Sequence, residues 1–140
     1  MGFLVYRLQK QKDKFDYTMQ RPLLNFVNTP QSGWVILNVG NGPALNIRFM
    51  GKDRTSWVQP VIGYAIPPNI ALTIQEEIKN AGAALAVYYK DLFDNEYMVE
   101  CEADTNSIVY KRGDKNWNEE QYNLIHHNVR RSDLLHLISL

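Results

Sequence analysis

The sequence predicts a mainly β fold: an immunoglobulin-like antiparallel β-sandwich with a C-terminal helical segment and a short helix or arm at the N-terminus. Short apolar stretches recur between residues 21 and 112, separated by turn signals at intervals of roughly 8 to 12 residues. No helical stretch is interleaved with them, which argues against a parallel sheet. A length of 140 residues, of which 45% are apolar, fits one domain with one core. We expect an arm over residues 1–20, the sandwich over 21–112 and a helical tail over 113–140.

The first part of the chain is polar, with apolar residues at a spacing that suits a helix. A short helix or arm over residues 7–20 should end before Arg21-Pro22, because the residue that precedes a proline avoids the α region. A short strand is expected over 23–27. The stretch 34–39 is rich in β-branched and aromatic residues and is apolar on both faces. We therefore expect it near the centre of a sheet, covered on both sides for part of its length.

The segment 40–43 breaks the β pattern with two glycines and a proline. We expect Gly40 and Gly42 to adopt positive φ in a tight connection between strands. Asn38 and Asn46 flank this turn and should hydrogen-bond backbone groups that it leaves without partners. Strand-like alternation then resumes over two stretches, with these side chains inward: Leu45, Ile47, Phe49, Ile70, Leu72 and Ile74.

The clearest local prediction is a β-hairpin over residues 84–102. Its inward side chains form a ladder in which the two tyrosines can stack: Leu85, Val87, Tyr89, Tyr97, Val99 and Cys101. Asp91 and Asn95 should hydrogen-bond backbone groups of the connection between the two strands. Glu100 and Glu102 are expected to point to solvent.

The rest of the chain predicts an edge strand and then two helices. Residues 107–110 would close the sheet. Asn116 is expected to cap a helix, with Glu119 three residues later as in a capping box. Ser132 is expected to cap a second short helix over residues 134–140. The apolar side chains of that segment exceed what one short helix buries, so they either pack on the sandwich or join a second copy: Leu134, Leu135, Leu137, Ile138 and Leu140.

Three motifs resemble those of an uncharacterised class of bacterial membrane-associated domains. They are Arg21-Pro22-Leu23, the stretch 38–46, which fits NxGxGPAxN, and the stretch 88–97, which contains YxDxFxxxY. The resemblance covers roughly residues 21–102. It implies a β-sandwich that follows a membrane helix on the cytoplasmic side of the inner membrane, and it implies no known reaction. The chain departs from that class by lacking the membrane helix, unless residues 2–6 are its remnant.

The N-terminal residues allow two interpretations. Residues 3–6 are apolar and are followed by four basic residues up to Lys14, as at the cytoplasmic end of a membrane span. Residues 3–14 are then a candidate membrane contact. They suit an ordinary first element with a solvated charged face equally well. Cys101 is the one cysteine, so no internal disulfide forms, which favours a reducing, cytoplasmic compartment.

The sequence carries no recognisable catalytic, cofactor or metal motif, and we expect none of these sites. Fifteen basic and fifteen acidic residues cancel, so nucleic acid is not an expected partner. Gly40 and Gly42 lack the third glycine of a dinucleotide loop. His126 and His127 are adjacent and would diverge on a helix, which disfavours a shared metal ion.

We expect a non-enzymatic binding or assembly domain near the cytoplasmic face of a bacterial membrane. Self-association would use the C-terminal apolar segment, above all Leu134, Leu137 and Ile138. The alternative is a small-molecule or sugar-binding domain, or a weak hydrolase, that uses loops at one end of the sandwich. Its candidate ligand residues combine aromatic rings with few polar groups, as binding pockets do: Trp57, Tyr64, Asp91 and Trp117.

Overall fold

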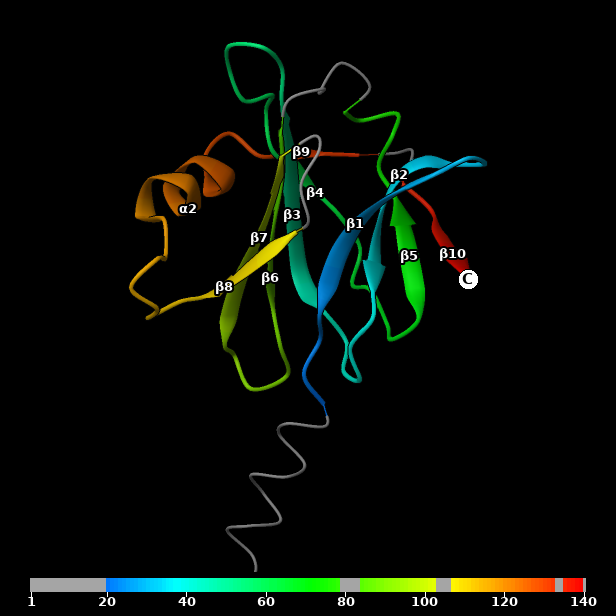
Figure 1. Cartoon of the computed structure of the whole chain (residues 1–140), viewed down its shortest axis with the longest axis horizontal. Helices are drawn as coiled ribbons and strands as arrows, with labels where there is room; N and C mark the ends of the chain where they lie inside the picture. The colour runs from blue at the N-terminus through cyan, green and yellow to red at the C-terminus, as the bar shows by residue number, and fades with distance from the viewer. Residues whose placement is uncertain (1–19, 79–83, 103–106, 133–134, 140) are drawn as a thin grey trace, which may run out of the picture.

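The computed structural model is a mainly β protein in which two packed sheets form a sandwich-like fold with a short C-terminal helix (Figure 1). The structure describes residues 20–78, 84–102, 107–132 and 135–139. Its elements are β1 (Leu24–Thr29), β2 (Gly33–Asn38), β3 (Leu45–Lys52), β4 (Val61–Ile62), β5 (Ile70–Thr73), β6 (Ala84–Lys90), β7 (Glu96–Glu102), β8 (Ile108–Lys111), α2 (Glu119–His126), β9 (Arg130–Arg131) and β10 (Leu137–Ser139).

The strand orders are β1-β2-β5-β10 in one sheet and β8-β7-β6-β3-β4-β9 in the other. All the pairings are antiparallel except that of β4 with β9, which is parallel. β2 lies inside its sheet, and its Val35 and Ile36 are both fully buried, which confirms the expectation for the stretch 34–39. β8 is an edge strand, as predicted.

The main core lies between the two sheets and confirms the predicted hairpin. β6 and β7 pair so that Leu85 faces Cys101, Val87 faces Val99 and Tyr89 faces Tyr97. The rings of the two tyrosines stack, with centroids 5.1 Å apart and planes inclined by 19°. The four-stranded sheet contributes further core side chains from alternate positions: Leu24, Phe26, Ile36, Leu72 and Ile74.

Asn38 fixes the connection between β2 and β3, as predicted. Its Oδ1 accepts hydrogen bonds from the backbone N–H groups of Leu23 and Gly40, and its Nδ2 donates to the carbonyl oxygens of Gly42 and Ile66. The Asn38 side chain is fully buried. Four hydrogen bonds from one residue of β2 therefore hold together the segment before β1, the β2–β3 connection and the loop before β5.

The expectation of positive φ at Gly40 and Gly42 is wrong. The described residues with positive φ include Asn46, at 52°, but neither of these glycines. Both are glycine because backbone passes too close for a Cβ atom. A Cβ on Gly40 would lie 2.5 Å from the backbone nitrogen of Leu23, and one on Gly42 would overlap the carbonyl oxygen of Gln20.

Helix α2 packs on the outer face of the six-stranded sheet and makes a second, smaller core. This core consists of Met50, Ala86, Tyr88 and Ile125. The helix is capped by Asn118, whose Oδ1 accepts from the backbone N–H of Gln121 at 3.0 Å. The expected cap at Asn116 is wrong, because that residue lies within a turn closed by Trp117 N–H and the carbonyl of Asp114.

Because α2 lies over this face of the sheet, Glu100 and Glu102 of β7 differ in exposure. Glu102 is exposed as expected, but Glu100 is half-buried, so the prediction for Glu100 is wrong.

The expected helix over residues 134–140 is also wrong. Residues Leu137–Ser139 form β10, which pairs with β5 at the edge of the four-stranded sheet. The unpaired backbone of β5 supplies hydrogen-bond partners that local helix propensity does not reveal. Leu135 enters the core between the sheets. Leu134, Leu140 and the N-terminal arm lie outside the described residues. Within the described residues, no helix has the length and apolar character needed to cross a bilayer.

Candidate functional site

A pocket opens on the outer face of the six-stranded sheet, beside α2. It has a volume of about 420 Å³. We call it the helix pocket and define it by six side chains: Arg48, Tyr88, Lys90, Glu96, Tyr122 and His126. The alternation along β3, β6 and β7 directs the strand residues outward, since Arg48 pairs with Tyr88 and Lys90 pairs with Glu96 across the sheet.

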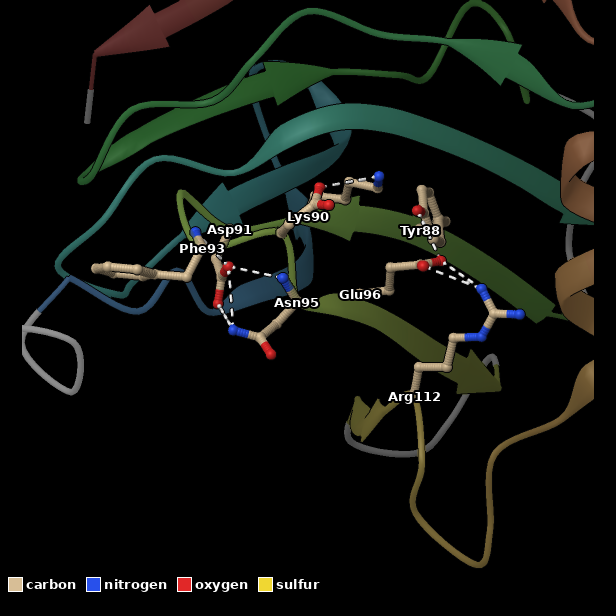
Figure 2. A network of polar contacts seen from close by, with 8 residues as sticks. Tyr88, Lys90, Asp91, Phe93, Asn95, Glu96 and Arg112 are labelled. Atoms are coloured by element: carbon tan, nitrogen blue, oxygen red, sulfur yellow. Dashed lines mark hydrogen bonds and ion pairs between the residues drawn. The ribbon is translucent and has the colours of Figure 1, made fainter. Parts of the chain in front are cut away.

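Glu96 is the acid of the pocket, and its carboxylate is already engaged (Figure 2). The Tyr88 hydroxyl donates to Oε2 at 2.9 Å, and Arg112 Nη1 donates to Oε1 at 2.9 Å and to Oε2 at 3.1 Å. Burial pushes the pKa of Glu96 up, but the hydrogen bonds from Tyr88 and Arg112 outweigh it and leave the pKa below its usual value. Burial, and then the Glu96 carboxylate, raise the pKa of Tyr88. Glu96 is therefore ionised and Tyr88 neutral at pH 7.

The aromatic wall of the pocket comes from α2 and β6. Tyr122 and His126 are four residues apart and lie on one face of the helix, with ring centroids 4.2 Å apart. The Tyr88 ring meets the His126 ring edge-on at 4.4 Å. On the outer side, the Arg112 guanidinium lies 4.4 Å from the centre of the Tyr122 ring. These contacts fix the orientation of the rings.

His126 presents a neutral ring to the pocket. Its Nδ1 lies 2.8 Å from the carbonyl oxygen of Tyr122, which can only accept, so Nδ1 carries the proton and Nε2 is an acceptor. Burial lowers the pKa of His126, while its bond to the Tyr122 carbonyl acts in the opposite direction. At neutral pH the ring is therefore an uncharged stacking surface.

The free charge of the pocket is positive. Arg48 makes no ion pair with any residue that the structure describes. Lys90 pairs at 3.1 Å with Asp94, whose side chain is 84% exposed. Such an exposed pair is weak and exchanges readily. Since Arg112 and Tyr88 already satisfy Glu96, the groups left to meet a ligand are two cations beside aromatic rings.

The residues that we predicted for a ligand site are spread over the molecule. Trp57 lines a different pocket, on the other side of α2, and Tyr64 is exposed beyond β4. Trp117 lies next to the helix pocket, with its ring 5.8 Å from that of Tyr122. Asp91 is buried in the β6–β7 turn, where its Oδ1 accepts from the backbone N–H groups of Phe93 and Asn95, as predicted (Figure 2).

Two of the three C-terminal candidates, Leu137 and Ile138, lie on β10. Leu137 is 44% exposed and Ile138 is half-buried, while Leu134 lies outside the described residues. The segment thus packs on the sandwich as a strand, and its outer edge remains unpaired in the described part of the chain.

The residues of the helix pocket were not identified from the sequence. Each of its strand residues alternates with a core residue. In the sequence, this pattern is typical of the solvent-exposed face of a strand. The available signal was the pair Tyr122 and His126, whose spacing places two rings on one side of a helix. No protein-family profile matches the chain, and neither the curated proteins nor the solved structures contain a match.

Proposed function

We propose that this protein is a non-enzymatic binding domain that holds a small aromatic anion in the helix pocket. The observation that carries the proposal is Arg48, a cation without an acidic partner among the described residues, beside the rings of Tyr122 and His126. The ligand anion pairs with Arg48. Its flat ring packs on the wall formed by Tyr122 and His126.

The engaged state of Glu96 supports this assignment. An unpaired acid in the pocket would neutralise Arg48 and repel an anion. Arg112 and Tyr88 both donate hydrogen bonds to the Glu96 carboxylate, so it does not compete for Arg48. A charge-assisted hydrogen bond to Arg48 is worth about 1.5–3 kcal/mol, which corresponds to about 10- to 150-fold in affinity.

Calorimetric titration with four probes tests the proposal. Phenyl phosphate and benzoate carry both a ring and an anion, whereas inorganic phosphate and benzyl alcohol carry one of the two. We expect the first two to bind more tightly than the last two. Arg48→Gln should weaken the binding of phenyl phosphate by about tenfold or more, while Arg54→Gln, an exposed loop residue, should leave it unchanged. Equal affinity of Arg48→Gln and the unaltered protein would refute the proposal.

We also propose that the sandwich is immunoglobulin-like. The order β1-β2-β5 in one sheet and β7-β6-β3-β4 in the other supports this assignment. It corresponds, in chain order, to A-B-E opposite G-F-C-C′ of variable-type immunoglobulin domains. β8 and β9 extend the second sheet, and β10 takes the place beside β5.

A location at the cytoplasmic face of a bacterial membrane is proposed from the sequence of residues 3–14, where an apolar stretch precedes four basic residues. Flotation with vesicles that contain anionic phosphatidylserine tests it. The full chain should float with these vesicles and less with neutral phosphatidylcholine vesicles. Replacement of Lys10, Lys12 and Lys14 by Glu should abolish flotation, and equal flotation of this variant would contradict the proposal.

A further inference from the structure

A second pocket lies on the opposite side of α2 and shares no lining residue with the helix pocket. Its volume is about 470 Å³. We call it the Gln121 pocket and define it by six side chains: Lys52, Trp57, Glu100, Ile108, Tyr110 and Gln121. These residues come from β3, the loop after it, β7, β8 and α2. The pocket therefore depends on helix and sheet being packed together.

Two polar atoms of residues that line this pocket are buried and have no hydrogen-bond partner in the described part of the chain. One is Nε2 of Gln121, a side chain that is only 8% exposed. The other is Oε1 of Glu100. Native proteins rarely leave such groups unpaired, and an unpaired group calls for an explanation of its own. Here the unpaired donor and the unpaired acceptor belong to two residues that line the same cavity.

The remaining lining is suited to a flat molecule. Trp57 and Tyr110 supply two aromatic side chains, and Ile108 supplies an apolar one. Lys52 Nζ lies 5.9 Å from the centre of the Trp57 ring, so its charge is associated with that ring. Burial, and then the charge of Glu102, raise the pKa of Glu100. Burial therefore makes the charged form of Glu100 less favourable. A hydrogen-bond donor on a ligand would stabilise its carboxylate.

We propose that the Gln121 pocket is a second binding site, for a small planar amide such as a pyrimidinone or lactam ring. On binding, the two side chains turn toward the ligand, so that the amide N–H donates to Glu100 Oε1 and the amide carbonyl accepts from Gln121 Nε2. The ring packs against Trp57 and Tyr110. An amide has the one donor and one acceptor that the two unpaired groups require, and ligand pockets combine such polar groups with aromatic walls.

The test is titration of the full chain with uracil and with 1,3-dimethyluracil, followed by the ¹H–¹⁵N signals of the Gln121 amide and the Trp57 indole. Uracil should shift both signals. Dimethyluracil, which has no N–H, should bind at least about tenfold more weakly. Equal binding of the two compounds, or the absence of any shift with uracil, would overturn the proposal.

Variants separate a binding role from a structural one. Gln121→Met keeps the size of the side chain and removes the unpaired donor, so uracil binding should fall about tenfold while the melting temperature stays the same or rises. Glu100→Gln should weaken binding without unfolding the chain, and exposed Glu120→Gln is the matched control. A loss of stability without a loss of uracil binding would refute the assignment. Arg48→Gln should leave uracil binding intact, which separates this site from the helix pocket.

Discussion

The stacked tyrosines of the core allow a prediction in which two nearly identical substitutions have different effects. Tyr89 and Tyr97 are both fully buried and lie opposite each other on β6 and β7. The Tyr97 hydroxyl donates to Asp91 Oδ2 at 2.9 Å. The Tyr89 hydroxyl is buried and has no hydrogen-bond partner of good geometry among the described residues, although the backbone N–H of Leu24 is close enough to act to lower its pKa. Replacement of each by phenylalanine removes one oxygen atom from the same layer of the core.

The expected magnitudes follow from those partners. Tyr97→Phe removes a buried hydrogen bond to a carboxylate, which is worth about 1.5–3 kcal/mol. Asp91 keeps its bonds from the N–H groups of Phe93 and Asn95, so we expect a loss near the lower limit, about 1.5–2 kcal/mol. Tyr89→Phe removes a buried group that was unpaired, so the free energy of unfolding should stay within about 0.5 kcal/mol or rise by up to about 1 kcal/mol.

Urea unfolding followed by tryptophan fluorescence measures both values. The urea dependence of the unfolding free energy should be the same for the two variants and the unaltered protein, so that the shift of the midpoint reports stability alone. A Tyr89→Phe variant that is less stable than Tyr97→Phe would refute the reasoning, because it would mean that stacking geometry outweighs the hydrogen bond.

Three further predictions concern the same sandwich. Asp91→Ala should lower the unfolding free energy by about 2–4 kcal/mol, since the turn loses its buried acceptor, whereas exposed Asp94→Asn should change it by less than about 0.5 kcal/mol. Gly40→Ala should cost about 1–3 kcal/mol in the same urea assay, because its Cβ meets backbone. Burial raises the pKa of Tyr89 from 10.0 to about 12. Its contribution to stability is therefore complete below pH about 10 and lost as the pH rises to about 12, and Tyr89→Phe should reduce the loss of stability measured over that range.

The period-two pattern was sufficient to predict the hairpin of β6 and β7. Its strands are neighbours in sequence, and a fixed alternation determines which side chains enter the core. The stack of Tyr89 on Tyr97, the hydrogen bonds of Asp91 in its turn and those of Asn38 to Gly40 and Gly42 followed from the same local rules. Local contacts of this kind are encoded within a few residues, so the sequence alone reveals them.

Most of the errors came from contacts between distant segments. The leucine-rich residues 134–140 have a high helix propensity. Residues 137–139 nevertheless form β10, because they pair with the open edge of β5. The close approach at Gly40 depends on Arg21 and Leu23, which lie far back in the chain. Similarly, whether Glu100 is solvated depends on where α2 lies over the sheet. The alternation of residues within one strand does not show which element covers its outer face.

The helix pocket escaped prediction for the same reason. Arg48 and Lys90 each read as the polar position of a half-buried strand. They become a site because β3 and β6 are adjacent and α2 adds two rings above them. The residues predicted for ligand binding are aromatic or acidic residues of loops. The helix pocket instead consists of side chains that neighbouring strands and α2 direct to the same face of the sheet.

The stretch after α2 covers one edge of each sheet, because β9 pairs with β4 and β10 pairs with β5. During synthesis, these edges of β4 and β5 stay unpaired until residues 130–139 have left the ribosome. A nascent chain halted before that point would expose the unpaired backbone of two edge strands, which is a template for intermolecular pairing. Premature termination near residue 129 should thus yield insoluble protein rather than a smaller folded domain.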